Sequence, residues 1–289
     1  MKNYLKLARV HHYIKNFFVF LPLFFSFKIF DIPNLLITVG GFIAFSLFTS
    51  VVYVVNDIRD VNKDRLHPKK CKRPIASGEI SEKNAGIFAA ILFAAATVFL
   101  ILSCRNTYMG YVYLILYFGL NLFYSFGGKN LPIVDVAVLA SGFLIRLLFG
   151  AVICGVEISN WLYLTVVAIS FFFALGKRRN ELMMGKETRT VLKYYSHEYL
   201  DKMMYMFMTV AIVFYSLWCV DPITVEKFAS SNILWTVPLV ILVCMRYSML
   251  IEGNTDGDPV EVIIHDKILM ALIGLYGIVI LSMMYLKRY

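Results

Sequence analysis

The chain has 289 residues, of which 60% are hydrophobic and only 16% are charged. A soluble domain is typically about half apolar and about a quarter charged, so this composition argues against an ordinary soluble protein. The formal net charge is +9, but the Lys and Arg residues gather in a few short segments, a pattern typical of membrane topology and of binding to anionic groups rather than to nucleic acid.

The apolar residues form nine blocks, and each block approaches the roughly 20 residues that a helix needs to cross a bilayer. Backbone groups in lipid must be hydrogen-bonded within the segment, and the blocks are too long for barrel strands, so we expect helices. The predicted spans are 14–30, 34–55, 84–103, 108–126, 132–154, 160–176, 203–220, 232–250 and 268–286. The sequence therefore predicts an all-α, polytopic membrane protein with one domain over residues 1–289.

The first block follows basic residues, as the apolar part of a signal peptide does. It is interrupted by Pro22 and Lys28, and no cleavage site of small residues follows it. We therefore expect a retained first span rather than a cleaved leader.

Basic residues predict the orientation, because cytoplasmic loops carry an excess of Lys and Arg. With the N-terminus inside, 21 of the 28 Lys and Arg fall in cytoplasmic segments and five in outer ones. The richest inner loops are 56–83 and 177–202. The sequence thus predicts a multi-pass protein of the cell membrane, with the C-terminus outside. Within the second of these loops, residues 188–202 mix aromatic and charged residues at helical spacing, which predicts an interfacial helix.

The loop after the second block, NDIRDVNKDRLHPKKCKRP, carries the clearest chemistry. Asp57, Asp60 and Asp64 stand at i, i+3 and i+7, so a helical continuation would place the three carboxylates on one face. Converging carboxylates repel one another unless a cation lies among them. Hard oxygen ligands suit Mg²⁺, whose coordination is commonly completed by water and substrate phosphates.

Neutral and cationic side chains accompany these acids. Asn56 offers a neutral oxygen ligand or a donor. Cationic groups that could hold phosphate oxygens follow the acids: His67, Lys69, Lys70, Lys72 and Arg73. A solvated loop that follows the topology rule would explain the Lys and Arg, but not three acids in helical register at a membrane boundary.

The pattern N-D-x-x-D-x-x-x-D at 56–64 resembles the first aspartate-rich motif of the UbiA prenyltransferase superfamily. This resemblance implies nine transmembrane helices, bound Mg²⁺-diphosphate, and Asp57, Asp60 and Asp64 as metal ligands and catalytic residues. Tyr124, Lys129 and Asp135 match the junction between the superfamily's fourth and fifth helices.

The second motif departs from the superfamily pattern. A further D-x-x-x-D is usual after the sixth helix, but this chain has GKRRNEL at 176–182. Lys177 and Arg178, with Glu181, suit a second phosphate better than a second metal. GKRRNEL, the segments RVHHYIKNFFVFLPLF and HPKKCKRP, and residues 246–269 with Arg246 resemble the decaprenyl-phosphate phosphoribosyltransferase branch.

This resemblance implies transfer of 5-phosphoribose from phosphoribosyl pyrophosphate (PRPP) to a polyprenyl phosphate, with release of Mg²⁺-pyrophosphate. The alternative within the superfamily is a prenyltransferase that joins a prenyl diphosphate to an aromatic or other acceptor. A transporter is the alternative outside it, but charges paired near mid-membrane would then be expected. The oligomeric state stays open, a homo-oligomer included.

Three further residues are candidates for substrate contacts. Arg146 lies inside the fifth block, and arginines within a membrane usually face a cavity or a partner. A structural ion pair is the alternative for Arg146. Lys15 and Asn16 open the first block, where snorkelling of Lys15 to the membrane surface explains its position nearly as well. The acidic segment from Glu252 to Asp266 is either a solvated lid or a contact for ribose hydroxyls or loop cations.

Overall fold

The computed structural model describes residues 2–67, 70–105, 107–184, 190–253 and 258–285. These ranges contain α-helices, 3-10 helices and turns, and no strand among them, so the all-α prediction is confirmed. Eight of their helices are long and apolar enough to cross a membrane. The chain divides into two compact units: unit 1 holds residues 1–125 and 145–157, and unit 2 holds residues 126–144 and 158–289.

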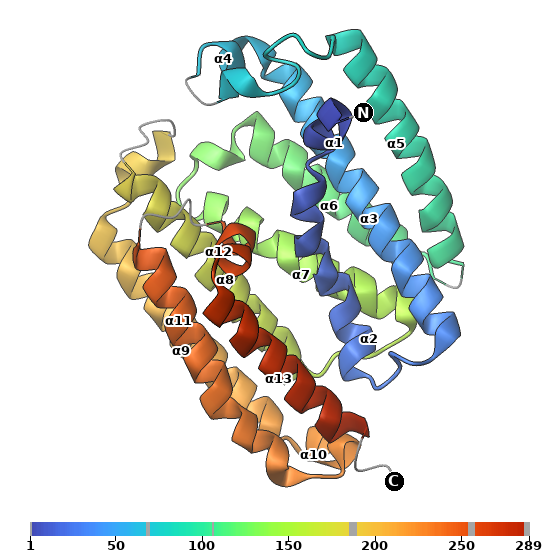
Figure 1. Ribbon diagram of the computed structural model, residues 1–289, viewed down its shortest axis with the longest axis vertical. Helices are drawn as coiled ribbons and strands as arrows, with labels where there is room; N and C mark the ends of the chain where they lie inside the picture. The colour runs from blue at the N-terminus through green and yellow to red at the C-terminus, as the bar shows by residue number, and fades with distance from the viewer. Residues whose placement is uncertain (1, 68–69, 106, 185–189, 254–257, 286–289) are drawn as a thin grey trace. The chain divides into compact units, whose positions relative to one another are not determined.

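Unit 1 is built around the long helix α3 (Ile32–Arg59), along which α5 (Glu82–Ser103) runs side by side (Figure 1). Its other elements, in chain order, are α1 (Lys2–Ala8), η1 (Val10–Phe20), α2 (Leu21–Phe25), α4 (Val61–Arg65), η2 (Lys70–Lys72), α6 (Met109–Phe126) and the second half of α7 (Val134–Cys154). Two apolar clusters hold this unit together, one centred on Phe45 and Phe149 and one on Leu7 and Ile75.

Unit 2 contains a pair of long helices, α8 (Asn160–Met183) and α9 (His197–Val220), packed along each other (Figure 1). Its other elements are η3 (Gly128–Asn130), the first half of α7, η4 (Thr190–Tyr194), α10 (Pro222–Phe228), η5 (Ser231–Thr236), α11 (Val237–Glu252), α12 (Pro259–His265) and α13 (Lys267–Tyr285). Its core is apolar and includes Phe172, Met204, Tyr247 and Ile251.

Eight of the nine predicted blocks correspond to these long helices, and the first block differs. It contains the end of η1 and the short helix α2, which meet at Leu21. Pro22 follows at once, and a proline has no N–H to donate and clashes with the preceding turn. The predicted span over 14–30 is therefore not one continuous α-helix, since the 3-10 segment ends at Phe20 and α2 ends at Phe25.

Close approach of this segment to α7 depends on one glycine. A Cβ built on Gly150 would lie 2.1 Å from the carbonyl oxygen of Val19, so any side chain here would push the two elements apart. Small residues serve the same purpose at other helix contacts in membranes. Gly150 thus fixes η1 against the second half of α7.

The predicted interfacial helix over 188–202 is wrong in its extent. Residues 188–189 lie outside the described ranges, η4 forms a single short turn, and α9 already begins at His197. Ser196 follows η4 and caps α9 by accepting a hydrogen bond from the backbone N–H of Tyr199. Such a cap satisfies a donor that the first helical turn leaves unpaired.

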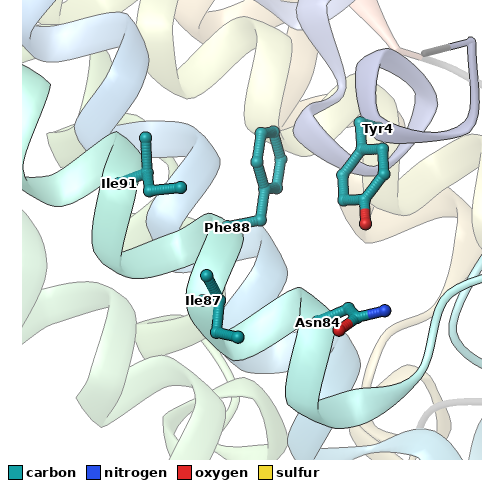
Figure 2. Close-up of a pocket in the computed structure, with 5 residues that line it drawn as sticks. All are labelled: Tyr4, Asn84, Ile87, Phe88 and Ile91. Carbon is teal, nitrogen blue, oxygen red and sulfur yellow. The ribbon is translucent and has the colours of Figure 1, made fainter.

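A groove of about 370 Å³ opens on unit 1 between α1 and α5 (Figure 2). Tyr4 lines one side, and Asn84, Ile87, Phe88 and Ile91 form a stripe of α5 on the other. None of the candidate site residues lines this groove. It is therefore a feature of the outer surface of α5, separate from the chemistry of the aspartate-rich motif.

Candidate active site

The aspartate-rich motif spans the junction of two helices in unit 1. Asp57 lies in the last turn of α3, the helix ends at Arg59, and α4 begins at Val61 with Asp64 in its first turn. Asp57 and Asp64 are both only 3% exposed. Burial of a carboxylate is costly unless a cation or hydrogen bonds compensate for it. We call Asp57 and Asp64 the acid pair.

One guanidinium bridges the acid pair. Nη1 of Arg73 lies 2.9 Å from Oδ1 of Asp57 and 2.6 Å from Oδ2 of Asp64. Arg9 donates to the same Oδ1 of Asp57 at 2.6 Å, and Nζ of Lys70 lies 4.0 Å from Oδ1 of Asp64. The two carboxylates are thus close enough to contact one positively charged atom together.

The third acid of the motif is placed differently. Asp60 lies between the two helices, its side chain is 27% exposed, and its Oδ1 lies 3.7 Å from Nε of Arg59. Within the described part of the chain, no group of three His, Cys, Asp or Glu side chains is arranged to hold a metal. The structure therefore brings Asp57 and Asp64 together, whereas Asp60 faces Arg59.

The acid pair nevertheless fits a divalent cation. Mg²⁺ is commonly held by one or two carboxylates, with water and substrate phosphates completing the octahedron. A single nitrogen of Arg73 already contacts both carboxylates, so a cation in its place would find two hard oxygen ligands. Arg73 and Lys70 lie beside the same oxygens, where they can donate to phosphate.

Neighbouring candidates tie the motif to its surroundings. Oδ1 of Asn56 accepts a hydrogen bond from Ser125 at 3.0 Å, which joins α3 to the end of α6 beside half-buried Tyr124. Nδ1 of His67 accepts from the backbone N–H of Lys70 at 3.3 Å. Lys69 lies outside the described residues.

Arg146 and Asn16 form a buried polar contact within unit 1. Nε of Arg146 donates to Oδ1 of Asn16 at 2.7 Å, and Nη2 donates to the Tyr117 hydroxyl at 3.1 Å. The guanidinium also lies over the rings of Phe45 and Tyr117. Lys15 precedes Asn16 on η1 and is half-buried. Of the three candidates Arg146, Lys15 and Asn16, the structure thus brings Arg146 and Asn16 into contact.

Unit 2 carries a second buried charge network. Arg178 and Asp135 are both fully buried, and Nε of Arg178 lies 2.5 Å from Oδ2 of Asp135. Nη1 of the same guanidinium lies 2.6 Å from Glu181. The Tyr195 hydroxyl donates to Oδ1 of Asp135 at 2.6 Å. Burial, together with the hydrogen bond to this carboxylate, raises the pKa of Tyr195, so the phenol keeps its proton and remains a donor.

The same network fixes the loop that carries Lys129. The backbone N–H of Ile133 donates to the Tyr195 hydroxyl at 2.6 Å. Ile133 has φ +69°, a conformation that a β-branched residue rarely adopts. Lys129, in η3, is half-buried on this loop. Tyr195 therefore holds both the start of α7 and the strained turn before it.

Two further candidate cations of unit 2 contact the acidic segment. Nζ of Lys177 lies 3.8 Å from Oδ2 of Asp258. Arg246 binds Asp266 through two nitrogens, at 3.1 and 2.6 Å. These hydrogen bonds lower the pKa of Asp266, whose Oδ1 also caps α13. Asp258 and Asp266 thus contact cations of the helices α8 and α11 rather than cations in loops, and Asp256 lies outside the described residues.

The sequence analysis did not identify two residues of these clusters as candidates. Arg9 stands 48 positions before Asp57, and Tyr195 stands 60 positions after Asp135. Arg9 lies inside a segment that resembles a family pattern, but nothing in the sequence indicates the turn that aims it at Asp57. The signal for Tyr195 was the aromatic and charged composition of 188–202, which we interpreted as an interfacial helix.

The fold and the motif agree with a match to the UbiA prenyltransferase family, whose model covers residues 17–273. The chain belongs to this family of membrane proteins. A decaprenyl-phosphate phosphoribosyltransferase of Mycolicibacterium smegmatis is 33% identical over 243 residues, which cover 80% of this chain and 75% of that protein. A protein of the same name from Corynebacterium glutamicum is 33% identical over 80% of this chain and 71% of its own length.

Solved structures show the same fold. A UbiA homologue from Archaeoglobus fulgidus bound to GPP and Mg²⁺ superposes with a TM-score of 0.71 at 21% identity, over 97% of this chain and 99% of that one. The same homologue bound to Cd²⁺ gives a TM-score of 0.67 at 19% identity, over the same shares.

Proposed function

We propose that the protein transfers 5-phosphoribose from PRPP to a polyprenyl phosphate and releases pyrophosphate with Mg²⁺. The observation that carries the proposal is the buried acid pair surrounded by Arg73, Arg9 and Lys70. Hard oxygen ligands beside several cations suit a metal-bound diphosphate. The names of the relatives support a phosphoribosyl donor in place of a prenyl one.

The residues of unit 1 would act on the leaving group. Asp57 and Asp64 would hold the cation, which when bound neutralises charge on the departing diphosphate. Arg73 and Lys70 would donate to its oxygens. The acceptor phosphate is already anionic and serves as the nucleophile, so a strong general base is unnecessary. Its lipid tail requires an apolar environment, which explains a catalyst built from membrane helices.

In unit 2, we propose that Lys177 binds a phosphate group. Its side chain is 29% exposed, and its Nζ lies 3.8 Å from Oδ2 of Asp258. Arg178 differs because its guanidinium is fully buried against Asp135 and Glu181. We therefore propose Lys177 as the phosphate ligand and Arg178 as the residue that fixes the helix end carrying it.

Donor selectivity tests the proposed function. Membranes containing the protein should transfer label from PRPP to polyprenyl phosphate in a Mg²⁺-dependent manner, and should not join geranyl diphosphate to 4-hydroxybenzoate. The Asp64→Asn variant, prepared in parallel, controls for other enzymes of the membrane. Transfer from the prenyl donor, with none from PRPP, would instead establish the prenyltransferase alternative.

We also propose that the acid pair faces the cytoplasm, on the evidence of the basic residues. In a variant without the five native cysteines, Ser77→Cys should react with an impermeant maleimide only after cells are opened. Lys227→Cys, exposed in α10, should react in intact cells. Labelling of position 77 in intact cells would reverse the proposed orientation.

A further inference from the structure

Arg9 lies outside the aspartate-rich motif, yet its side chain enters the acid pair. Its Nη2 lies 2.6 Å from Oδ1 of Asp57, the oxygen that also accepts from Arg73. The Arg9 side chain is 20% exposed, and its Cζ lies 4.5 Å from the centre of the Tyr53 ring. A guanidinium has five N–H donors. The contact with Asp57 uses one terminal nitrogen, so donors remain for a ligand that arrives beside this carboxylate.

The backbone aims Arg9 at Asp57. Its φ of 52° and ψ of 47° lie in the left-handed region, which residues with a Cβ rarely adopt. Contacts on both sides hold this turn against α3. Ser50 donates to the carbonyl oxygen of Ala8 at 2.7 Å and contacts the Tyr13 hydroxyl at 2.8 Å. A strained conformation that neighbouring contacts enforce is a reason to look for function there.

Ligand binding would change the net charge of the acid pair and its cationic neighbours. The two carboxylates of the acid pair face two guanidinium groups, those of Arg9 and Arg73, with Lys70 at the edge of ion-pair distance. A divalent cation bound to Asp57 and Asp64 would therefore meet positive neighbours that repel it. A diphosphate carries several negative charges, which would neutralise the excess positive charge of the cation and the two guanidinium groups. Arginine suits this exchange because its fork donates equally well to carboxylate and phosphate.

We propose that Arg9 is an additional diphosphate-binding residue. It pairs with Asp57 before the cation binds and donates to the diphosphate afterwards. This inference rests on the proposed function, because it assumes a metal-diphosphate at the acid pair. It implies that the cation and the diphosphate strengthen each other's binding, and that the coupling is reciprocal. Removal of Arg9 should then affect the two ligands in opposite directions.

Calorimetric titration of the purified full-length protein tests this inference, with Mg²⁺ alone and with pyrophosphate in excess Mg²⁺. In Arg9→Gln, pyrophosphate should bind about ten- to hundredfold more weakly, the loss expected for one charge-assisted hydrogen bond. Mg²⁺ alone should bind more tightly than in the wild type, because a cation that competes for Asp57 is gone. Arg9→Lys should recover part of the pyrophosphate affinity.

The matched control is Arg105→Gln, which removes the same charge from an exposed position after α5 and should change neither affinity. Equal pyrophosphate affinity in Arg9→Gln and the wild type would overturn the inference. Parallel weakening of Mg²⁺ and pyrophosphate, with a lower unfolding temperature, would make Arg9 merely structural and would also overturn it. A wild type that binds neither ligand would contradict the proposed function itself.

Discussion

Replacement of Asp57 by Asn should lower the rate of phosphoribosyl transfer at least about a hundredfold. Asp57 is a buried member of the acid pair and accepts from two guanidinium groups. Metal stabilisation of a leaving group is worth several kcal/mol, and a loss of about 2.7 kcal/mol corresponds to a hundredfold lower rate. Excess EDTA should reduce the wild type to a similar level. The measurement is the initial rate in detergent with saturating PRPP and lipid acceptor.

Asp31→Asn provides the matched control, because Asp31 is an exposed acid just before the other end of the same helix. Its rate should equal that of the wild type.

We expect Asp60→Asn to abolish turnover as well, if the third carboxylate joins the pair when metal is bound. Thermal unfolding of each variant separates lost chemistry from lost folding. Full activity of Asp57→Asn, or of the wild type in EDTA, would exclude a metal at the acid pair.

Replacement of Arg178 by Met should destabilise the protein by about 3–5 kcal/mol, the usual cost of removing one partner of a buried ion pair. Arg178 and Asp135 are both fully buried, so the substitution leaves Asp135 without its closest cation. The measurement is thermal unfolding of the purified variant in detergent. Lys202→Met, which removes a cation at an exposed position of α9, should change the unfolding temperature little.

A second substitution shows whether the loss comes from the unpaired acid. Adding Asp135→Asn to Arg178→Met removes the uncompensated charge and should recover part of the stability. If Arg178→Met unfolds like the wild type but binds PRPP weakly, Arg178 is a substrate ligand, as the sequence had suggested, rather than a structural cation.

Much of the fold could be predicted because lipid imposes a strong pattern. Eight blocks of about 20 apolar residues became eight long helices, since a helix satisfies its own backbone within the membrane. The N-terminal block was less predictable. Pro22 and Lys28 interrupt its apolar run, but nothing in the sequence indicates 3-10 geometry over Val10–Phe20. This segment also lies against Gly150 of α7 at Val19, a contact between residues far apart in sequence that local pattern does not show.

The candidate site could be predicted only where its residues are close in sequence. Asp57, Asp64 and Arg73 lie within 17 positions of one another, and the structure brings them together, although the sequence had assigned Arg73 to phosphate and not to the acids. Helical register also predicted convergence of Asp60, but α3 ends one residue earlier, and the break turns Asp60 toward Arg59. Arg9 and Tyr195 come from distant segments whose turns depend on tertiary contacts, so local pattern could not reveal them.

The fate of the two ends of PRPP tests the central claim most directly. Purified protein would be given polyprenyl phosphate and Mg²⁺ with PRPP that carries radioactive phosphorus either at the 5-phosphate or at the terminal phosphate of the diphosphate. The proposed transfer predicts that the 5-phosphate label enters the lipid phase and that the diphosphate label stays in water as pyrophosphate. Diphosphate label in the lipid, or no label there from either substrate, would contradict phosphoribosyl transfer.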